Sequence, residues 1–133
     1  MKHLLTLACF LAAYVFLPQP GNAATAYVKS GKTTLIAQLV GWDKRCRSTG
    51  YARVIFLKKP RHGRASSRRG GRYPIPSKTS IGRAGKCKGK RIRGVGIYYR
   101  SNRNFRGRDT IRFKARAGNG KRYYTYQRKV IVR

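Results

Sequence analysis

The chain has 133 residues and carries 33 basic side chains (Lys and Arg) against two acidic ones, a formal net charge of +31. Its length fits one domain of ordinary size, and a hydrophobic fraction of 41% is too high for a purely disordered basic tail. Catalysis usually requires carboxylates, histidines or free thiols. Since Asp43 and Asp109 are the only acids, the composition argues against most enzyme classes, and we expect a protein that is not an enzyme.

The N-terminal segment has the layout of a secretory signal peptide. A short basic start precedes an apolar run over residues 4–17, and small residues follow the run. The run of about 14 residues is shorter than the ~20 that a membrane-spanning helix needs. We expect residues 1–24 to be a signal peptide, cleaved after Ala23 to Ala26, and the mature protein to be secreted or periplasmic without a transmembrane segment. A lipid anchor on Cys9 is the lesser alternative.

Two cysteines, Cys46 and Cys87, lie beyond this segment. An even number of cysteines in an exported chain indicates a disulfide, and closing a loop of about 42 residues would stabilise the fold by ~4 kcal/mol in the chain-entropy model. The alternative is a metal pair. Two sulfurs do not make a zinc site, however, and His62 is the only histidine nearby. We therefore expect no metal site and no cofactor.

Five segments of the remaining chain have the composition of β-strands. They combine β-branched and aromatic residues with alternation at period two, and glycine and proline punctuate the intervals between them. These segments are residues 35–40, 51–57, 92–99, 111–117 and 124–132. No segment shows a helical stripe. The pattern predicts an all-β fold, an antiparallel sandwich that forms a single domain over residues 25–133.

The stretch over residues 61–90 differs from its surroundings because it is rich in Arg and Lys and poor in apolar residues. Pro74-Ile75-Pro76 gives it an extended piece. We expect either a long basic loop or a pair of short edge strands. A Cys46–Cys87 disulfide would tether the far end of this segment.

The run from Tyr99 to Phe113 contains Asn104-Phe105-Arg-Gly107-Arg-Asp109 and resembles a signature of bacterial cadherin-like and immunoglobulin-like repeat modules. The signature is an aromatic residue, a proline two residues on, and then Asn-Phe-x-Gly-x-Asp-x-Phe-x-Tyr. The Pro60–Gly63 turn and the closing Val130-Ile131-Val132 strand are similar to the same modules, so that the resemblance covers residues 58–133. It implies an immunoglobulin-like β-sandwich in an exported protein.

Two departures from the family pattern bear on function. Ser101 stands where the signature has proline, and Asn119-Gly120 stands where an Asp-rich turn would be expected. The acidic residues that bind calcium in many such modules are missing, which argues against calcium binding. The resemblance therefore implies a fold and export but supplies no mechanism.

Few residues could carry catalytic or ligand chemistry. His62 lies in a turn, and we expect it at the surface. For Asp109 we expect a carboxylate that accepts backbone N–H groups or pairs with a nearby arginine, and for Asp43 a role in a turn. Gly31-Lys32-Thr33 matches only the end of a phosphate-binding loop. Trp42 is expected in the core.

The charge itself is the strongest signal. In the strand near residue 112, Arg112, Lys114 and Arg116 should share one face at ~6.6–6.8 Å, twice the strand rise, and this spacing suits a polymer with regularly placed anionic groups. Arginine also binds phosphate, sulfate and carboxylate bidentately. The candidate polyanion-binding residues are Arg64, Arg68, Arg69, Arg72, Lys86, Lys88, Lys90, Arg100, Arg103, Arg106, Arg108, Arg112, Lys114 and Arg116.

Two functions are expected from different classes. The first is an exported module that binds an anionic polymer or an anionic envelope surface, such as lipopolysaccharide, acidic polysaccharide, glycosaminoglycan or nucleic acid. The second is a structural or adhesive envelope module of immunoglobulin-like type with a protein partner. A small hydrolase or nuclease has the weaker support, a toxin acting on membranes lacks an amphipathic helix, and no small-molecule substrate is expected.

Overall fold

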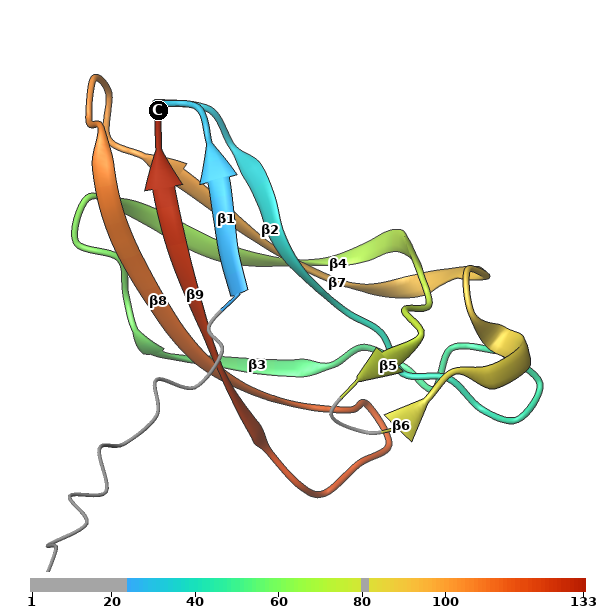
Figure 1. Ribbon diagram of the computed structural model, residues 1–133. Coiled ribbons are helices and arrows are strands. Elements are labelled where there is room, and N and C mark those ends of the chain that lie inside the picture. The colour runs from blue at the N-terminus through green and yellow to red at the C-terminus, as the bar shows by residue number, and fades with distance from the viewer. Residues whose placement is uncertain (1–23, 80–81) are drawn as a thin grey trace, which may run out of the picture.

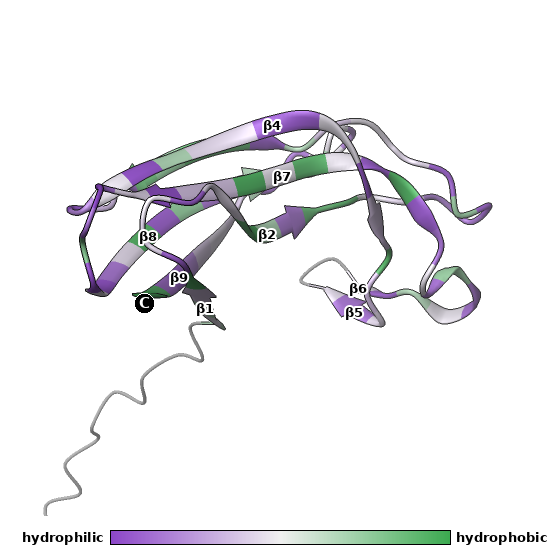
Figure 2. Ribbon diagram, turned by 90° about the horizontal axis from the view of Figure 1, so that it is seen from above, coloured by the Kyte–Doolittle hydropathy of each residue, from purple (hydrophilic) through white to green (hydrophobic). Residues whose placement is uncertain are grey.

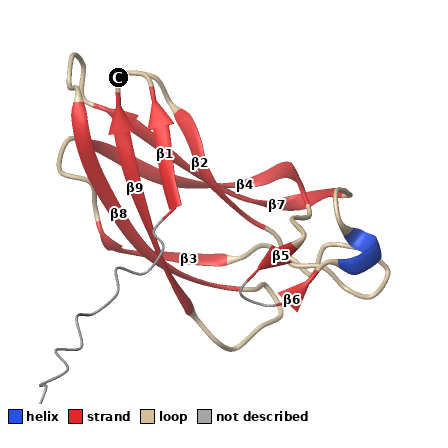
Figure 3. Ribbon diagram, viewed as in Figure 1, coloured by secondary structure: helices blue, strands red, loops and turns tan. Residues whose placement is uncertain are grey.

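The computed structural model describes residues 24–79 and 82–133, which form an all-β structure (Figures 1 and 3). The long strands are β1 (Ala24–Val28), β2 (Thr34–Leu39), β3 (Arg53–Lys58), β4 (Gly63–Pro74), β7 (Arg91–Ser101), β8 (Gly107–Arg116) and β9 (Tyr124–Val132). The short elements are the strands β5 (Lys78–Thr79) and β6 (Gly82–Arg83) and the 3₁₀-helix η1 (Gly85–Cys87).

The long strands form two sheets. The four-stranded sheet has the order β1-β9-β8-β3, and the three-stranded sheet has the order β2-β7-β4. All neighbours are antiparallel except β1 and β9, which run parallel. The strands β5 and β6 form a separate small pair that lies with η1 at one end of the molecule, toward which β4 and β7 run together (Figure 1).

The main core lies between the two sheets. It contains the fully buried Tyr99 and Ile97 from β7, Phe113 and Ile111 from β8, and Val130 from β9. In β8 and β9 these residues alternate with more exposed ones, and changes between hydrophobic and hydrophilic colour along the strands are visible in Figure 2. Burial of large side chains on one face of each strand stabilises the sandwich, since each such side chain contributes about 1.5–3 kcal/mol.

All five strands expected from the sequence are present, with ends that differ by up to four residues. Two others were missed. The strand β1 is short and alanine-rich, and β4 is a 12-residue strand at the edge of the three-stranded sheet. Of the two alternatives for residues 61–90, the long basic loop is therefore corrected: residues 63–74 form an edge strand that pairs with β7, although it is long, and the short β5–β6 pair and η1 follow it.

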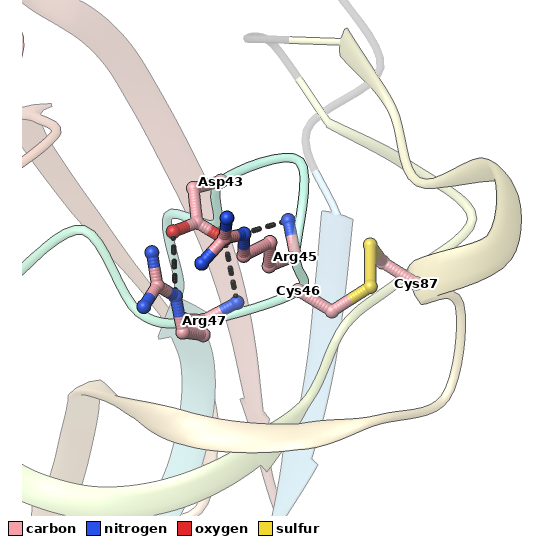
Figure 4. Close-up of a disulfide and its surroundings, with 5 residues drawn as sticks. All are labelled: Asp43, Arg45, Cys46, Arg47 and Cys87. Carbon is pink, nitrogen blue, oxygen red and sulfur yellow. Dashed lines mark hydrogen bonds and ion pairs between the residues drawn. A yellow bond between two sulfur atoms is a disulfide. The ribbon is translucent and has the colours of Figure 1, made fainter.

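The predicted disulfide between Cys46 and Cys87 is confirmed, with 5.2 Å between the Cα atoms (Figure 4). It lies in a second buried cluster with Ile75, Ala84 and Ile92, against which Trp42 and Val40 pack. This cluster is separate from the main core. The disulfide therefore closes the end of the molecule that carries η1.

Asp43 organises the loop that carries Cys46, as Figure 4 shows. One carboxylate oxygen accepts hydrogen bonds from the backbone N–H groups of Arg45 and Arg47, both at 2.9 Å, and the other accepts one from the Arg47 guanidinium at 3.0 Å. The backbone hydrogen bond from Arg47 is the largest cause that lowers the pKa of Asp43. The expected turn role is confirmed.

Asp109 connects the two sheets at the opposite end. Its buried carboxylate accepts hydrogen bonds from the backbone N–H groups of Arg61 and His62 in the β3–β4 turn, and from the hydroxyl of Tyr99 in β7. Burial is the main cause that raises the pKa of Tyr99, and the bond to Asp109 adds to it. The first of the two expected roles, acceptance of backbone N–H groups, is therefore confirmed.

Ser101, which replaces the proline of the resembled signature, has a structural role of its own. Its buried hydroxyl accepts a hydrogen bond from the N–H of Gly31 at 2.8 Å and donates one to the carbonyl of Asn102. A proline could make neither bond, since it lacks the hydroxyl. The bond from Gly31 therefore ties the β1–β2 turn to the end of β7.

The expected signal peptide lies outside the described residues except for Ala24, where β1 begins. Among residues 24–79 and 82–133, no helix is long and apolar enough to cross a membrane.

Candidate polyanion interface

The outer side of β8 carries a row of basic side chains. Arg108, Arg112, Lys114 and Arg116 alternate with the buried Asp109, Ile111, Phe113 and Ala115. The expected alternation of this strand is confirmed, and it places the row on the solvent side of the four-stranded sheet.

The neighbouring strands add cations to the row. Arg53 of β3 lies directly opposite Arg116, and Lys58 lies opposite Arg112. On the other side of β8, Lys129 of β9 lies opposite Thr110. We call this surface the basic face, and its members are Arg53, Lys58, Arg108, Arg112, Lys114, Arg116 and Lys129.

The basic face has no internal counter-charge. Side chains directly opposite each other on antiparallel strands have Cβ atoms about 4.5–5.5 Å apart, and like charges at this separation destabilise the sheet. Within residues 24–79 and 82–133, the one ion pair joins Asp43 to Arg47, away from this face. The carboxylate of Asp109 points inward and is occupied by backbone and tyrosine donors. An external anion would therefore relieve the repulsion between the opposed cations.

The β8–β9 turn holds one end of the basic face in place. The guanidinium of Arg116 donates hydrogen bonds to the carbonyl of Gly120 at 2.7 Å and to the hydroxyl of Tyr123 at 3.3 Å. The ammonium of Lys114 lies 5.1 Å from the centre of the same Tyr123 ring. Contacts of this kind reduce the rotamer entropy that a long side chain loses on binding.

A basic cleft continues the basic face at the start of β8. It encloses about 320 Å³ and is lined by Lys58, Arg61, His62, Arg108, Asp109 and Thr110. His62 is exposed, as expected, and its ring stacks on Phe105 with 4.2 Å between the ring centres. The cleft therefore combines the cations of Lys58, Arg61 and Arg108 with the Asp109 carboxylate, whose hydrogen bonds come from neutral backbone and tyrosine donors.

Eight of the other ten predicted binding residues fall in three separate places. Arg64, Arg68 and Arg100 lie on the outer side of the three-stranded sheet, Lys86, Lys88 and Lys90 at the disulfide end, and Arg103 and Arg106 in the β7–β8 loop. Arg69 is exposed on β4, and Arg72 exchanges hydrogen bonds with Arg91, each guanidinium donating to the other's carbonyl. The structure thus brings four of the fourteen together on the basic face, namely Arg108, Arg112, Lys114 and Arg116.

The outer side of the three-stranded sheet has a different character. Tyr73 lies buried over Gly96, and its hydroxyl is 3.2 Å from the hydroxyl of Tyr98. Burial, together with the hydrogen bond to Tyr98, raises the pKa of Tyr73 to about 12. The guanidinium of Arg68 lies 4.6 Å from the centre of the Tyr98 ring. The tyrosines and Arg68 on this side are therefore already packed against one another.

Sequence reasoning left Arg53, Lys58 and Lys129 out of the candidate site. The run that contains Arg53 is apolar at consecutive positions, so that its alternation does not identify a face. Lys58 reaches the outer side because of a register shift between Phe56 and Lys58. No pattern in the sequence predicts this shift. Lys129 has the parity opposite to that of Val130 and Val132, so its outward position could have been predicted from the sequence.

No group of three or more His, Cys, Asp or Glu side chains that could hold a metal ion occurs in the described part of the chain. Comparison with protein-family models, curated proteins and solved structures finds no match to this chain.

Proposed function

We propose that the protein is an exported module that binds polyanions through the basic face and is not an enzyme. The observation that carries the proposal is the opposition of like charges across two positions of the β3–β8 pair, Arg53 with Arg116 and Lys58 with Arg112, among cations that form no ion pair with a carboxylate. Each opposed pair costs stability in isolation. Phosphate, sulfate or carboxylate groups from one polymer would accept hydrogen bonds from both cations of each pair and so offset their repulsion.

Regular spacing favours a polymer over a single small anion. Successive outward residues of β8 are about 6.6–6.8 Å apart and adjacent strands about 4.8 Å apart. Four cations stand along β8, with three more on its neighbours. The basic face contains no element that reads nucleic-acid bases. Binding would therefore depend on charge and on the release of counterions.

One further observation supports export, and another bears on the expected cleavage site. The disulfide fits an oxidising compartment. The strand β1 pairs with β9 from Ala24 onward, so that signal cleavage after Ala23 would leave β1 whole, whereas cleavage after Ala26 would remove Ala24–Ala26 from it. We expect N-terminal sequencing of the exported protein to begin at Ala24.

The strand order supports the proposed immunoglobulin-like sandwich. If the seven long strands are lettered A to G in chain order, the three-stranded sheet reads B-E-D and the four-stranded sheet reads A-G-F-C. Constant-type immunoglobulin domains combine B-E-D and C-F-G in the same way, with strand A on the B-E-D sheet. The disulfide differs, because it lies at one end of the sandwich instead of joining B to F.

Binding can be tested by heparin chromatography of the purified protein in a salt gradient. We expect elution well above physiological ionic strength, and elution below ~0.15 M NaCl would contradict the proposal. Retention on a heparin matrix should also exceed retention on a cation exchanger of lower charge density, since counterion release grows with the charge density of the polymer.

A second candidate is the adhesive module with a protein partner. It is favoured by the free edge of β3, where Ile55 and Leu57 are 41% and 48% exposed. Arg53 and Lys58 flank this apolar run, and flanking charges protect an edge strand from pairing with other strands. A pull-down from envelope extracts, repeated after nuclease and polysaccharide digestion, separates the two. Capture that survives digestion and is lost in an Ile55→Thr/Leu57→Thr variant would favour the protein partner.

A further inference from the structure

A cleft between the two sheets has properties that the basic face does not explain. It encloses about 230 Å³ and opens at the end of the sandwich opposite the β7–β8 loop. The end of β2 contributes Leu39 and Val40, and β9 contributes Tyr124, Tyr126 and Arg128. Basic residues that line it are Lys78, Arg116 and Arg128, and no acidic residue does.

Arg128 occupies a position that the strand pattern assigns to an apolar residue. It pairs across β8 with Ile111, which is fully buried, and it shares the inward side of β9 with Tyr126 and Val130. Its guanidinium donates a hydrogen bond to the carbonyl of Gln127 at 3.1 Å. Partial burial lowers the pKa of Arg128. A half-buried cation without a carboxylate nearby costs free energy, and a bound anion would offset that cost.

The three basic residues of the cleft are not equivalent. The guanidinium of Arg116 is engaged by the Gly120 carbonyl and the Tyr123 hydroxyl in the β8–β9 turn, and Lys78 is exposed on β5. Arg128 is the one placed on the inward side of a strand. Its planar guanidinium offers two parallel donors to a carboxylate.

The size and the walls of the cleft restrict the ligand. A volume of about 230 Å³ lies below the ~300–1,000 Å³ typical of sites for drug-sized ligands. It equals the space of roughly seven or eight waters at ~30 Å³ each. Aromatic side chains present an apolar face beside a polar hydroxyl, an arrangement that suits a sugar ring with its CH groups and hydroxyls. A bare inorganic anion would leave these walls unused.

We propose that this cleft binds one carboxylated sugar residue, a hexuronate, with its carboxylate on Arg128 and its ring against Tyr124 and Tyr126. The proposal rests on the proposed polyanion function and deepens it, because it identifies an acidic polysaccharide as the polymer class. The cleft would hold a single residue at a chain end, while the basic face would hold the rest of the polymer.

The test is a titration of the protein with monomeric glucuronate, followed by isothermal calorimetry and amide NMR. Glucose serves as the neutral ring and sodium sulfate as the bare anion. We expect glucuronate to bind, to shift the amide signals of residues 124–128, and to bind at least tenfold more tightly than glucose or sulfate. Equal binding of glucose or sulfate, or signal shifts confined to β8 outside the cleft, would overturn the proposal.

Variants separate a ligand contact from a structural role. Arg128→Gln should weaken glucuronate about 10- to 100-fold, the effect of losing a charge-assisted hydrogen bond, and Arg128→Lys should restore part of the affinity. Arg106→Gln removes the same charge from the exposed β7–β8 loop at the far end and should leave glucuronate binding unchanged. Unchanged affinity in Arg128→Gln, with a folded NMR spectrum, would refute the site.

Failure of the cleft proposal can be distinguished from failure of the proposed polyanion function. Arg128→Gln and Arg106→Gln each remove one positive charge, so both should elute from heparin close to the unmodified protein. If heparin retention persists while glucuronate does not bind, the cleft proposal is wrong and the basic face stands. If neither ligand binds, both proposals are wrong.

Discussion

The two sheets of the sandwich share one core but have different outer sides. The four-stranded sheet presents seven cations on three adjacent strands, four of them at alternating positions of β8. The three-stranded sheet presents Arg64, Arg68 and Arg100, of which Arg68 covers Tyr98, while Tyr73 covers Gly96. The first side groups its cations along β8 and its neighbours, whereas on the second side Arg68 packs against Tyr98, and the exposed Arg64 and Arg100 lie opposite each other. The comparison shows that net charge alone does not locate a binding surface, because the arrangement of neighbouring side chains decides which cations remain available.

The two ends of the sandwich are also secured in different ways. At one end a disulfide joins the loop after β2 to η1, in a small cluster apart from the main core. At the other end Asp109 holds the β3–β4 turn and β7 by hydrogen bonds. We therefore expect different consequences from removing the disulfide and from removing the Asp109 hydrogen bonds.

Removal of the disulfide should have the largest effect on stability. For a loop of about 42 residues, the chain-entropy model gives a loss of ~4 kcal/mol for the Cys46→Ala/Cys87→Ala variant. Denaturant unfolding measures this loss, and hydrogen exchange locates it. Protection should fall first over residues 84–92 and persist in β8. A uniform loss of protection across both sheets would contradict the separation of the two clusters.

Asp109→Asn should follow in size, with a loss of about 2–4 kcal/mol, because a buried carboxylate that accepts backbone and tyrosine donors becomes an amide with a mismatched NH₂ group. Asp43→Asn is the matched control. It changes the net charge equally, but its carboxylate is partly exposed in a loop, so that the loss should be much smaller. Thermal unfolding of both variants measures the difference. Equal shifts in melting temperature would refute the assigned role of Asp109.

Tyr73→Phe should have the smallest effect, about 1 kcal/mol for one hydrogen bond, but a distinctive pH dependence. The folded protein raises the pKa of Tyr73 from 10.0 to about 12. Because the fold favours the protonated phenol, the associated stability is complete below pH 10 and is lost as the pH rises through about 12. Phenolate absorbance should show one late-titrating tyrosine fewer in Tyr73→Phe than in the unmodified protein, because Tyr99, whose pKa is also raised, remains in both. An unchanged titration curve would contradict the assignment.

Much of the fold could be predicted from local patterns, as the strand at residues 107–116 illustrates. Alternation in β8 identified both its buried and its basic sides, and two cysteines beyond the expected signal peptide identified the disulfide. The strand β4 could not be found in this way. Its sequence Gly63–Pro74 has few apolar residues, and it becomes a strand because it pairs along β7. Edge strands depend on such tertiary pairing more than on their own propensity.

The candidate site was predicted less completely than the fold. Whether Lys58 joins Arg112 depends on the register of β3 against β8 and on a local shift in it. Register is set by long-range packing. The inward position of Arg128 was not predicted either, although Arg128 has the same parity as Tyr124, Tyr126 and Val130.

The central claim is that polyanions bind to the four-stranded sheet, and matched triple variants test it most directly. Arg108→Gln/Arg112→Gln/Lys114→Gln removes three charges from the basic face, and Arg64→Gln/Arg68→Gln/Arg100→Gln removes three from the other side. Affinity for a short DNA duplex, used as a polyanion of known charge density, is measured as a function of salt. We predict that the slope of log K against log salt falls by about 2.7 in the first variant, from 0.9 per lost contact, and by less than about 1 in the second. Equal losses in the two variants would contradict the claim.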